Sequence, residues 1–224
     1  MRYGLLLTPL LLAAATAHAG VIIGGTRLVY HGEKKEASVG ITNPDSLDYL
    51  IQSWTDNSEN STTKPPFLVT PPLFRLDAHQ QNTLRVVHTG GNLPTDRESL
   101  YWLNIKAIPS STRQAGINTL QIAIKTRIKL IFRPQTVKGK PEESANMLEW
   151  RQQGQTLVVN NPTPFYMNFQ TVTVNGKKIS GVTWAKPKGD TQFTLPATVS
   201  GNTVSWSVIT DYGSISKTWS KPLH

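Results

Sequence analysis

The histidines of this 224-residue sequence are not spaced for catalysis or for metal binding. Four lie beyond the first 19 residues (His31, His79, His88 and His224), and none belongs to an H-E-x-x-H or H-x-H arrangement. We expect each to be a surface or loop histidine. The sequence has no G-x-S-x-G elbow, glycine-rich phosphate loop or EF-hand loop. It therefore predicts no enzymatic activity, no cofactor and no metal site.

The charged residues suggest binding more than catalysis. Asp96 and Glu98 would share a face of an extended segment, and we interpret them as a solvated acidic pair, not an acid–base couple. Arg27 and Lys129 each lie within an apolar or β-branched strand, where a cation needs a reason to be held. The usual interpretation of each is a solvated, outward charge. The pattern alone does not pair them, and a role in binding remains the alternative.

Lys129 belongs to an unusually long strand-like segment, NTLQIAIKTRIKLIFRP, at residues 118–134. One face carries the apolar residues, interrupted only by Thr126: Leu120, Ile122, Ile124, Ile128, Leu130 and Phe132. The other face is mostly polar: Gln121, Lys125, Arg127, Lys129 and Arg133, broken by Ala123 and Ile131. This period of two predicts a strand. Because strands usually run about 5–6 residues, part of it should protrude and be able to pair with another chain. The alternative is a long strand covered by the protein's own core.

The remaining chain reads as short strands separated by turn residues, at the spacing of about 8–12 residues typical of β-sandwiches. Before Pro134 the expected strands are 21–30, Ala37–Thr42, Tyr49–Thr55, Phe67–Thr70, Leu84–Val87 and Leu100–Ile108. The prolines on both sides of Phe67–Thr70 make it at most an edge strand. Residues 135–145 are polar and read as a linker. The second set is Met147–Arg151, Leu157–Asn160, Phe165–Val174, Ile179–Trp184, Gln192–Leu195, Thr203–Ile209 and Ser214–Trp219. The pattern predicts an all-β chain of two tandem sandwiches.

The N-terminus predicts export. Arg2, the apolar run Leu5–Ala15 and the small-x-small site Ala17-His18-Ala19 form a secretory signal peptide, with cleavage after Ala19. The alternative, a membrane anchor, is disfavoured because the run is shorter than the roughly 20 residues that span a bilayer. The sequence contains no Cys, so stability must come from packing and not from disulfides. Its net charge of +9 is dispersed and has no basic arm, which makes nucleic acid a poor partner for an exported protein.

Residues 93–110, LPTDRESLYWLNIKAIPS, closely resemble the signature segment of the periplasmic pilus-assembly chaperones, the PapD-like family. Residues 26–30 resemble that family's first strand, and 121–134 its donor strand; 161–166 and 211–213 resemble second-domain motifs. The resemblance implies two immunoglobulin-like β-sandwich domains set at an angle, with a cleft between them. The expected boundaries are a signal peptide at 1–19, an N-terminal domain at 20–140 and a C-terminal domain at 141–224.

The same resemblance implies roles for individual residues. Fimbrial subunits lack the last strand of their own sandwich, and the chaperone lends its donor strand to the open groove. The side chains that match this role are Leu120, Ile122 and Ile124. Arg27 and Lys129 match the two cations that bind the subunit's C-terminal carboxylate. Glu98, Arg133 and Asp211 match a structural charge cluster between the domains.

The resemblance also implies partners and location. It predicts a periplasmic protein that binds fimbrial subunits (pilins) and delivers them to an outer-membrane usher, without cofactor, nucleic acid or membrane insertion. The short loop at residues 109–118 resembles the short-loop branch of the family. Whether the free chaperone caps itself as a homodimer is left open. The alternatives are a structural two-domain fimbrial protein or adhesin, and an exported carbohydrate-active enzyme, which would need paired carboxylates facing a cleft.

Overall fold

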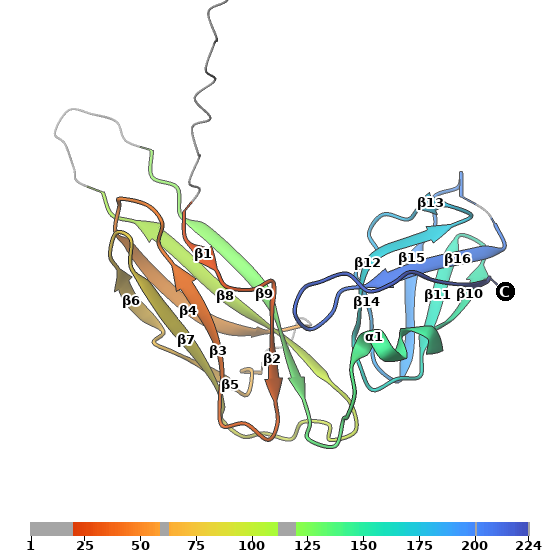
Figure 1. Cartoon of the computed structure of the whole chain (residues 1–224), viewed down its shortest axis with the longest axis horizontal. Helices are drawn as coiled ribbons and strands as arrows, with labels where there is room; N and C mark the ends of the chain where they lie inside the picture. Colours follow the sequence, from red (N-terminus) through yellow and green to blue (C-terminus); the bar gives the residue numbers. More distant parts are fainter. Residues whose placement is uncertain (1–19, 59–62, 112–119, 200, 224) are drawn as a thin grey trace, which may run out of the picture.

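The computed structural model describes residues 20–58, 63–111, 120–199 and 201–223. In these ranges the chain forms two β-rich lobes set at an angle, joined where β9 leads into the short helix α1 (Figure 1). None of the described helices is long and apolar enough to cross a membrane. The predicted signal peptide, His224 and most of the loop at 109–118 lie outside the described residues.

The N-terminal lobe is a sandwich of two sheets. Its strands are β1 (Ile22–Ile23), β2 (Arg27–His31), β3 (Ala37–Thr42), β4 (Tyr49–Asn57), β5 (Phe67–Thr70), β6 (Leu73–Leu76), β7 (Gln81–His88), β8 (Ser99–Pro109) and β9 (Ile124–Arg133). One sheet has the order β1-β3-β7-β5 and the other β2-β9-β8-β4-β6. β2 pairs with β9 in parallel, whereas the other neighbours pair antiparallel. Alternate apolar side chains fill the space between the sheets, among them Ile51, Leu84, Leu103 and Leu130.

The first strands cross from one sheet to the other at a glycine. β1 belongs to the first sheet and β2 to the second. Between them the Gly24 N–H donates to the Gly40 carbonyl at 2.9 Å. A Cβ at Gly24 would lie 3.2 Å from that oxygen, so the close backbone approach favours glycine. The crossing places Arg27, the first residue of β2, beside β9.

Most strands predicted in this half are present. β3 and β5 have the predicted bounds, and β5 is an edge strand, as its flanking prolines indicated. β6 was not predicted, because Pro71-Pro72 and the short run Leu73–Leu76 looked like a loop. It nevertheless pairs with the edge of β4 and buries Leu76.

The C-terminal lobe is a second sandwich. Its strands are β10 (Glu149–Gln153), β11 (Thr156–Asn161), β12 (Met167–Val174), β13 (Lys177–Lys178), β14 (Trp184–Ala185), β15 (Gly189–Thr194), β16 (Thr203–Val208) and β17 (Trp219–Pro222). One sheet has the order β10-β11-β15; in the other the order is β13-β12-β16-β17, and β14 also pairs with β12. The prediction of two tandem all-β sandwiches is confirmed.

Three local predictions in this half are wrong. The supposed linker at 135–145 contains α1 (Pro141–Ser144) and leads into the 3-10 turn η1 (Ala145–Met147). Pro141 and Ala145 are buried there, so the segment is part of the domain. The predicted strand Ile179–Trp184 is instead the connection between β13 and β14, and only Trp184 belongs to a strand; the predicted strand Ser214–Trp219 begins only at Trp219. In both cases a turn-rich connection was taken for a strand because of its isolated apolar residues.

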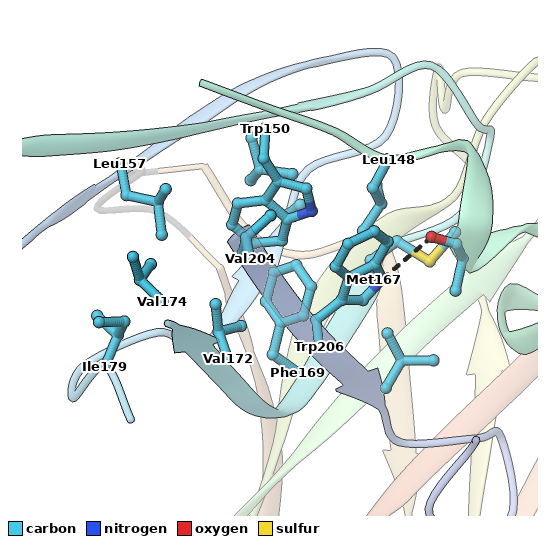
Figure 2. Close-up of a cluster of buried hydrophobic side chains, with 14 of the residues drawn as sticks. Leu148, Trp150, Leu157, Met167, Phe169, Val172, Val174, Ile179, Val204 and Trp206 are labelled. Atoms are coloured by element: carbon cyan, nitrogen blue, oxygen red, sulfur yellow. Dashed lines mark hydrogen bonds between the residues drawn. The ribbon is translucent and has the colours of Figure 1, made fainter. Parts of the chain in front are cut away.

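The core of the C-terminal lobe is built around aromatic rings (Figure 2). Trp150 packs against Phe169 and Trp206, with ring centroids 5.4 and 5.6 Å away. The Trp206 Nε1–H donates to the Ala145 carbonyl at 3.1 Å, which ties η1 to the core. Without a Cys in the chain, this packing carries the stability of the domain.

Replacing Trp206 by Phe should lower the free energy of unfolding of the C-terminal domain by about 1–3 kcal/mol, because it removes a buried hydrogen bond and part of a buried ring. Urea unfolding followed by circular dichroism measures the loss. The matched control is Trp219→Phe, since Trp219 Nε1 has no hydrogen-bond partner among the described residues. Equal losses for the two variants would contradict this account of the core.

Candidate functional site

β9 is covered unequally along its two edges. β8 pairs with it from Ile124 to Phe132. β2 pairs with the other edge only from Lys129 to Arg133, because β2 begins at Arg27. Within the described ranges, the edge of residues 124–128 on the β2 side therefore has no strand beside it. Backbone N–H and C=O groups on such an edge are free to pair with an added strand.

The apolar face of the same segment changes its surroundings at this point. Leu120, Ile122 and Ile124 are 87%, 65% and 48% exposed. Ile128 and Leu130, further along the same face, are buried in the N-terminal core. The alternative that the protein's own core covers the whole segment is therefore wrong for its first half. The regular strand is also shorter than the alternation suggested, because it begins at Ile124.

The two candidate cations meet where the free edge ends. Arg27 and Lys129 are directly paired in the parallel ladder and share a face. Residues of the C-terminal lobe hold both side chains across the cleft. Arg27 Nη1 donates to the Ile209 carbonyl at 3.3 Å, and Lys129 Nζ donates to Asn168 Oδ1. Lys129 Nζ also lies 4.6 Å from the centre of the Trp184 ring.

The positive charge of these two cations is only partly offset in the described ranges. Neither forms an ion pair there, and Arg27 Nε is buried without a hydrogen-bond partner. Burial, and then the charge of Arg27, lower the pKa of Lys129 to about 8. Burial also lowers the pKa of Arg27, against the opposing charge of Asp211. Two partly desolvated cations with an unused donor can bind a carboxylate or another small anion.

A separate charge cluster joins the two lobes. Arg133 Nε donates to Glu98 Oε1 at 2.7 Å, and its two terminal nitrogens donate to the Asp211 carboxylate at 2.7 and 2.8 Å. The second oxygen of Glu98 accepts the Tyr166 N–H at 2.7 Å. Burial by itself lowers the pKa of Arg133, but its bonds to Asp211 and the charge of Glu98 raise it overall, so the guanidinium stays charged. Asp211 lies in the loop after β16 that reaches toward the N-terminal lobe in Figure 1.

Two interpretations of polar residues need correction. Glu98 is 2% exposed and is not a solvated acid; Asp96, its supposed partner, is exposed and pairs with Arg97 and Lys188. His88 is also not a surface or loop residue, because it lies on β7 with its ring 5.3 Å from that of Phe132. The local pattern could not separate Glu98 from Asp96, because the groups bonded to Glu98, Arg133 and Tyr166, are distant in the sequence; only the family resemblance assigned Glu98 to the charge cluster. Among the described residues, no group of three or more His, Cys, Asp or Glu could hold a metal ion.

Sequence reasoning missed the part of the site that comes from the C-terminal lobe. Asn168 on β12, Trp184 on β14 and the Ile209 carbonyl after β16 surround the cation pair. Nothing in the sequence indicated them, because they lie 39 or more residues from Lys129 and belong to no recognisable motif. They face the cations only because the two lobes are set at this angle.

The geometry combines two β-sandwiches, a pair of cations that meets the second lobe and an open strand edge. Comparison with models of protein families identifies the family. Residues 20–138 match "Pili and flagellar-assembly chaperone, PapD N-terminal domain", and residues 143–220 match "Pili assembly chaperone PapD, C-terminal domain". The chain therefore belongs to the PapD-like family of pilus-assembly chaperones, a family of two immunoglobulin-like domains that is not enzymatic.

Individual relatives agree with this. The chain is 42% identical over 208 residues to the probable fimbrial chaperone LpfB of Escherichia coli O157:H7, covering 92% of this chain and 89% of the relative. It is similar to a chain in the structure of the Salmonella enterica SafA pilin in complex with the SafB chaperone (TM-score 0.85, 43% identity, 93% and 99% of the two chains covered). It is also similar to the periplasmic chaperone SfaE (TM-score 0.75, 33% identity, 92% and 100% covered). The alternative of a structural adhesin has no support from these relatives.

Replacing Arg133 by Ala should destabilise the protein by about 3–5 kcal/mol, because it leaves the buried Glu98 carboxylate without its cation. Thermal and urea unfolding measure the effect. Arg75→Ala is the matched control, since Arg75 also pairs with two carboxylates, Asp48 and Asp77, but on the surface. That variant should unfold almost like the parent chain, as surface ion pairs contribute little. Similar losses for both would argue against a buried structural cluster.

Lys129 should titrate near pH 8 in the folded protein, and an NMR titration of its Cε signal can measure this. Folding lowers this pKa, so the charged form opposes folding, and deprotonation above about pH 8 relieves that opposition. Replacing Arg27 by Gln should raise the pKa of Lys129 but leave it below the ordinary 10.5, because burial is the larger cause. A value of 10.5 in the parent chain would contradict the partly desolvated site.

Proposed function

We propose that this chain is a periplasmic chaperone that captures fimbrial subunits by lending the first half of its β9 segment to their incomplete fold. One observation carries the proposal. The free edge of residues 124–128, with the exposed row Leu120, Ile122 and Ile124, ends at the cations Arg27 and Lys129. An open edge, an apolar row and an anion site in line with them suit a partner strand that ends in a carboxylate.

The proposed carboxylate anchor would also fix the direction of that strand. A partner strand on the free edge of β9 occupies the position that β2 fills further along, and it must stop where β2 begins, at Arg27. If its last residue places the C-terminal carboxylate between Arg27 and Lys129, the strand runs toward Lys129. It therefore runs parallel to β9, as β2 does. The partner strand and β2 then follow one another along the same edge.

The apolar row would contribute to the affinity for the subunit, and the cations would fix the register of the added strand. Burying an aliphatic side chain contributes about 1.5–3 kcal/mol, so Leu120, Ile122 and Ile124 together offset a large part of the cost of association. Because side chains alternate, a slip of one residue would turn all three away from the groove of the subunit. A carboxylate fixed by Arg27 and Lys129 prevents such a slip. Glu98, Arg133 and Asp211 would act indirectly, by fixing the angle between the domains.

Further parts of the proposal rest on the sequence and on the family. The first 19 residues would direct export and be cleaved after Ala19, leaving domains at 20–140 and 141–224. The chaperone would pass its subunit to an outer-membrane usher. The short loop read from the sequence at residues 109–118 favours the short-loop branch of the family. The exposed apolar row of the free chaperone is also the surface through which a self-capping homodimer would form.

Replacing Ile122 by Asp should abolish subunit capture and leave the melting temperature unchanged, because this exposed side chain contributes nothing to the chaperone's own core. Co-expression in the periplasm with the fimbrial subunits of the host, followed by affinity capture and mass spectrometry, measures binding. Leu68→Asp is the control, since Leu68 is 57% exposed on β5, in the other sheet. It should capture subunits normally.

Lys129→Ala, tested in the same way, should fold normally and lose capture. Two results would overturn the proposal. One is capture by Ile122→Asp or Lys129→Ala at the level of the parent chain. The other is a fall in the melting temperature of Ile122→Asp as large as that for a core substitution.

A further inference from the structure

The cleft face of β9 carries three cations in a row, and each lies over a tryptophan ring. Lys125 Nζ lies 5.6 Å from the ring centre of Trp54, on β4. The guanidinium carbon of Arg127 lies 4.3 Å from that of Trp102, on β8. Lys129, the third cation, lies over Trp184 of the other lobe. We call Lys125 and Arg127, the two cations that the carboxylate site does not use, the basic pair.

The face of β9 that carries the basic pair has an excess of positive charge in the part of the chain that the structure describes. Neither residue forms an ion pair there, and the neighbour of Lys125 on β8 is another cation, Lys106. Asp56, on the same face, accepts a hydrogen bond from Asn104 and does not pair with Arg127. Both members of the basic pair are exposed. The face therefore has more positive than negative charge, and an acidic partner can neutralise the excess.

The tryptophan rings restrict the positions of these two charged side chains. A free Lys or Arg samples many rotamers, and fixing it costs conformational entropy. A cation over an aromatic face is held by the ring quadrupole while its N–H groups remain able to donate. Trp102 also contacts Trp184 edge to face, with centroids 6.1 Å apart, so the row that holds Arg127 continues to the ring that holds Lys129. The side chains of the basic pair are thus held in place before any ligand binds.

The basic pair lies beside the free edge. Lys125 and Arg127 fall within the stretch of β9 that β2 leaves unpaired, four and two residues before Lys129. Side chains on one face of a strand repeat about every 6.6–6.8 Å. Every second side chain of an added strand would therefore face the cleft at the same intervals, directly beside these cations.

We propose that Lys125 and Arg127 determine subunit specificity by binding acidic side chains at alternate positions of the partner's last strand, just before its C-terminal carboxylate. This inference rests on the proposed strand donation and names the kind of strand that the site prefers. The apolar row would contact the side of the subunit that forms its core. The basic pair would contact side chains on the opposite face of the subunit's last strand, which points toward the second lobe.

The test uses the mature chain and short synthetic peptides of Thr and Val with a free C-terminal carboxylate. In the first series, the third and fifth residues from the C-terminus are both Gln or both Glu. In the second series, the second and fourth residues from the C-terminus are both Gln or both Glu. Tryptophan fluorescence reports binding, because Trp102 and Trp184 adjoin the site. Glu should tighten binding about threefold to tenfold in one series only, as two partly exposed charge pairs allow. In K125Q/R127Q that gain should disappear.

The control variant is K177Q/K178Q, which removes two exposed cations from β13 in the other domain. It loses the same charge and should keep the gain. An equal gain in both peptide series, or a gain that survives in K125Q/R127Q, would overturn the inference in favour of general attraction. Binding of phosphatidylglycerol vesicles that is lost in K125Q/R127Q, without selectivity between peptides, would overturn it in favour of a lipid surface.

A Gln peptide with an amidated C-terminus separates the two proposals. If the free-acid Gln peptide binds better than its amide but Glu adds nothing, the anchor stands and the specificity inference fails. If the free acid and the amide bind equally in the parent chain, the carboxylate anchor of the proposed function fails as well.

Discussion

The parallel pairing of β2 with the second half of β9 is the constraint on which the site depends. β2 begins at Arg27, opposite Lys129, and therefore ends the free edge and places two cations side by side at the same position. An antiparallel partner in its place would bring a different residue opposite Lys129. Gly24 lets the chain reach this position from the other sheet. The free edge and the cation pair at its end thus come from a single choice of strand register.

The arrangement has an electrostatic cost that the second domain reduces. Two partly buried cations repel each other, and the lowered pKa of Lys129 reflects both their burial and this repulsion. The Ile209 carbonyl, the Asn168 side chain and the Trp184 ring offset part of the cost with dipoles and a quadrupole, but supply no full negative charge. The Asp211 carboxylate offsets part of the charge of Arg27 without pairing with it, so the site keeps an excess of positive charge. The Arg133 cluster keeps the domain that carries these groups in position.

Strands whose pattern depends on their own residues could be predicted from the sequence. β3 alternates cleanly and β5 lies between prolines, and both have the expected bounds. Segments that depend on distant partners could not. The polar stretch at 135–145 contains a helical turn whose end is bonded to the distant Trp206, and β6 pairs with the edge of β4. Glu98 looked solvated because the arginine that neutralises it lies 35 residues further along the chain.

By itself the sequence determined the alternation of residues 118–134, the cations at positions 27 and 129, and the lack of any disulfide, because these are properties of residue type and spacing. Only the tertiary structure decided which half of that alternating row is exposed. Leu120 and Leu130 belong to the same alternating row but have opposite surroundings, since the sandwich covers Leu130 and ends before Leu120. Register between distant strands and the angle between domains are collective results of packing, and no local pattern encodes them.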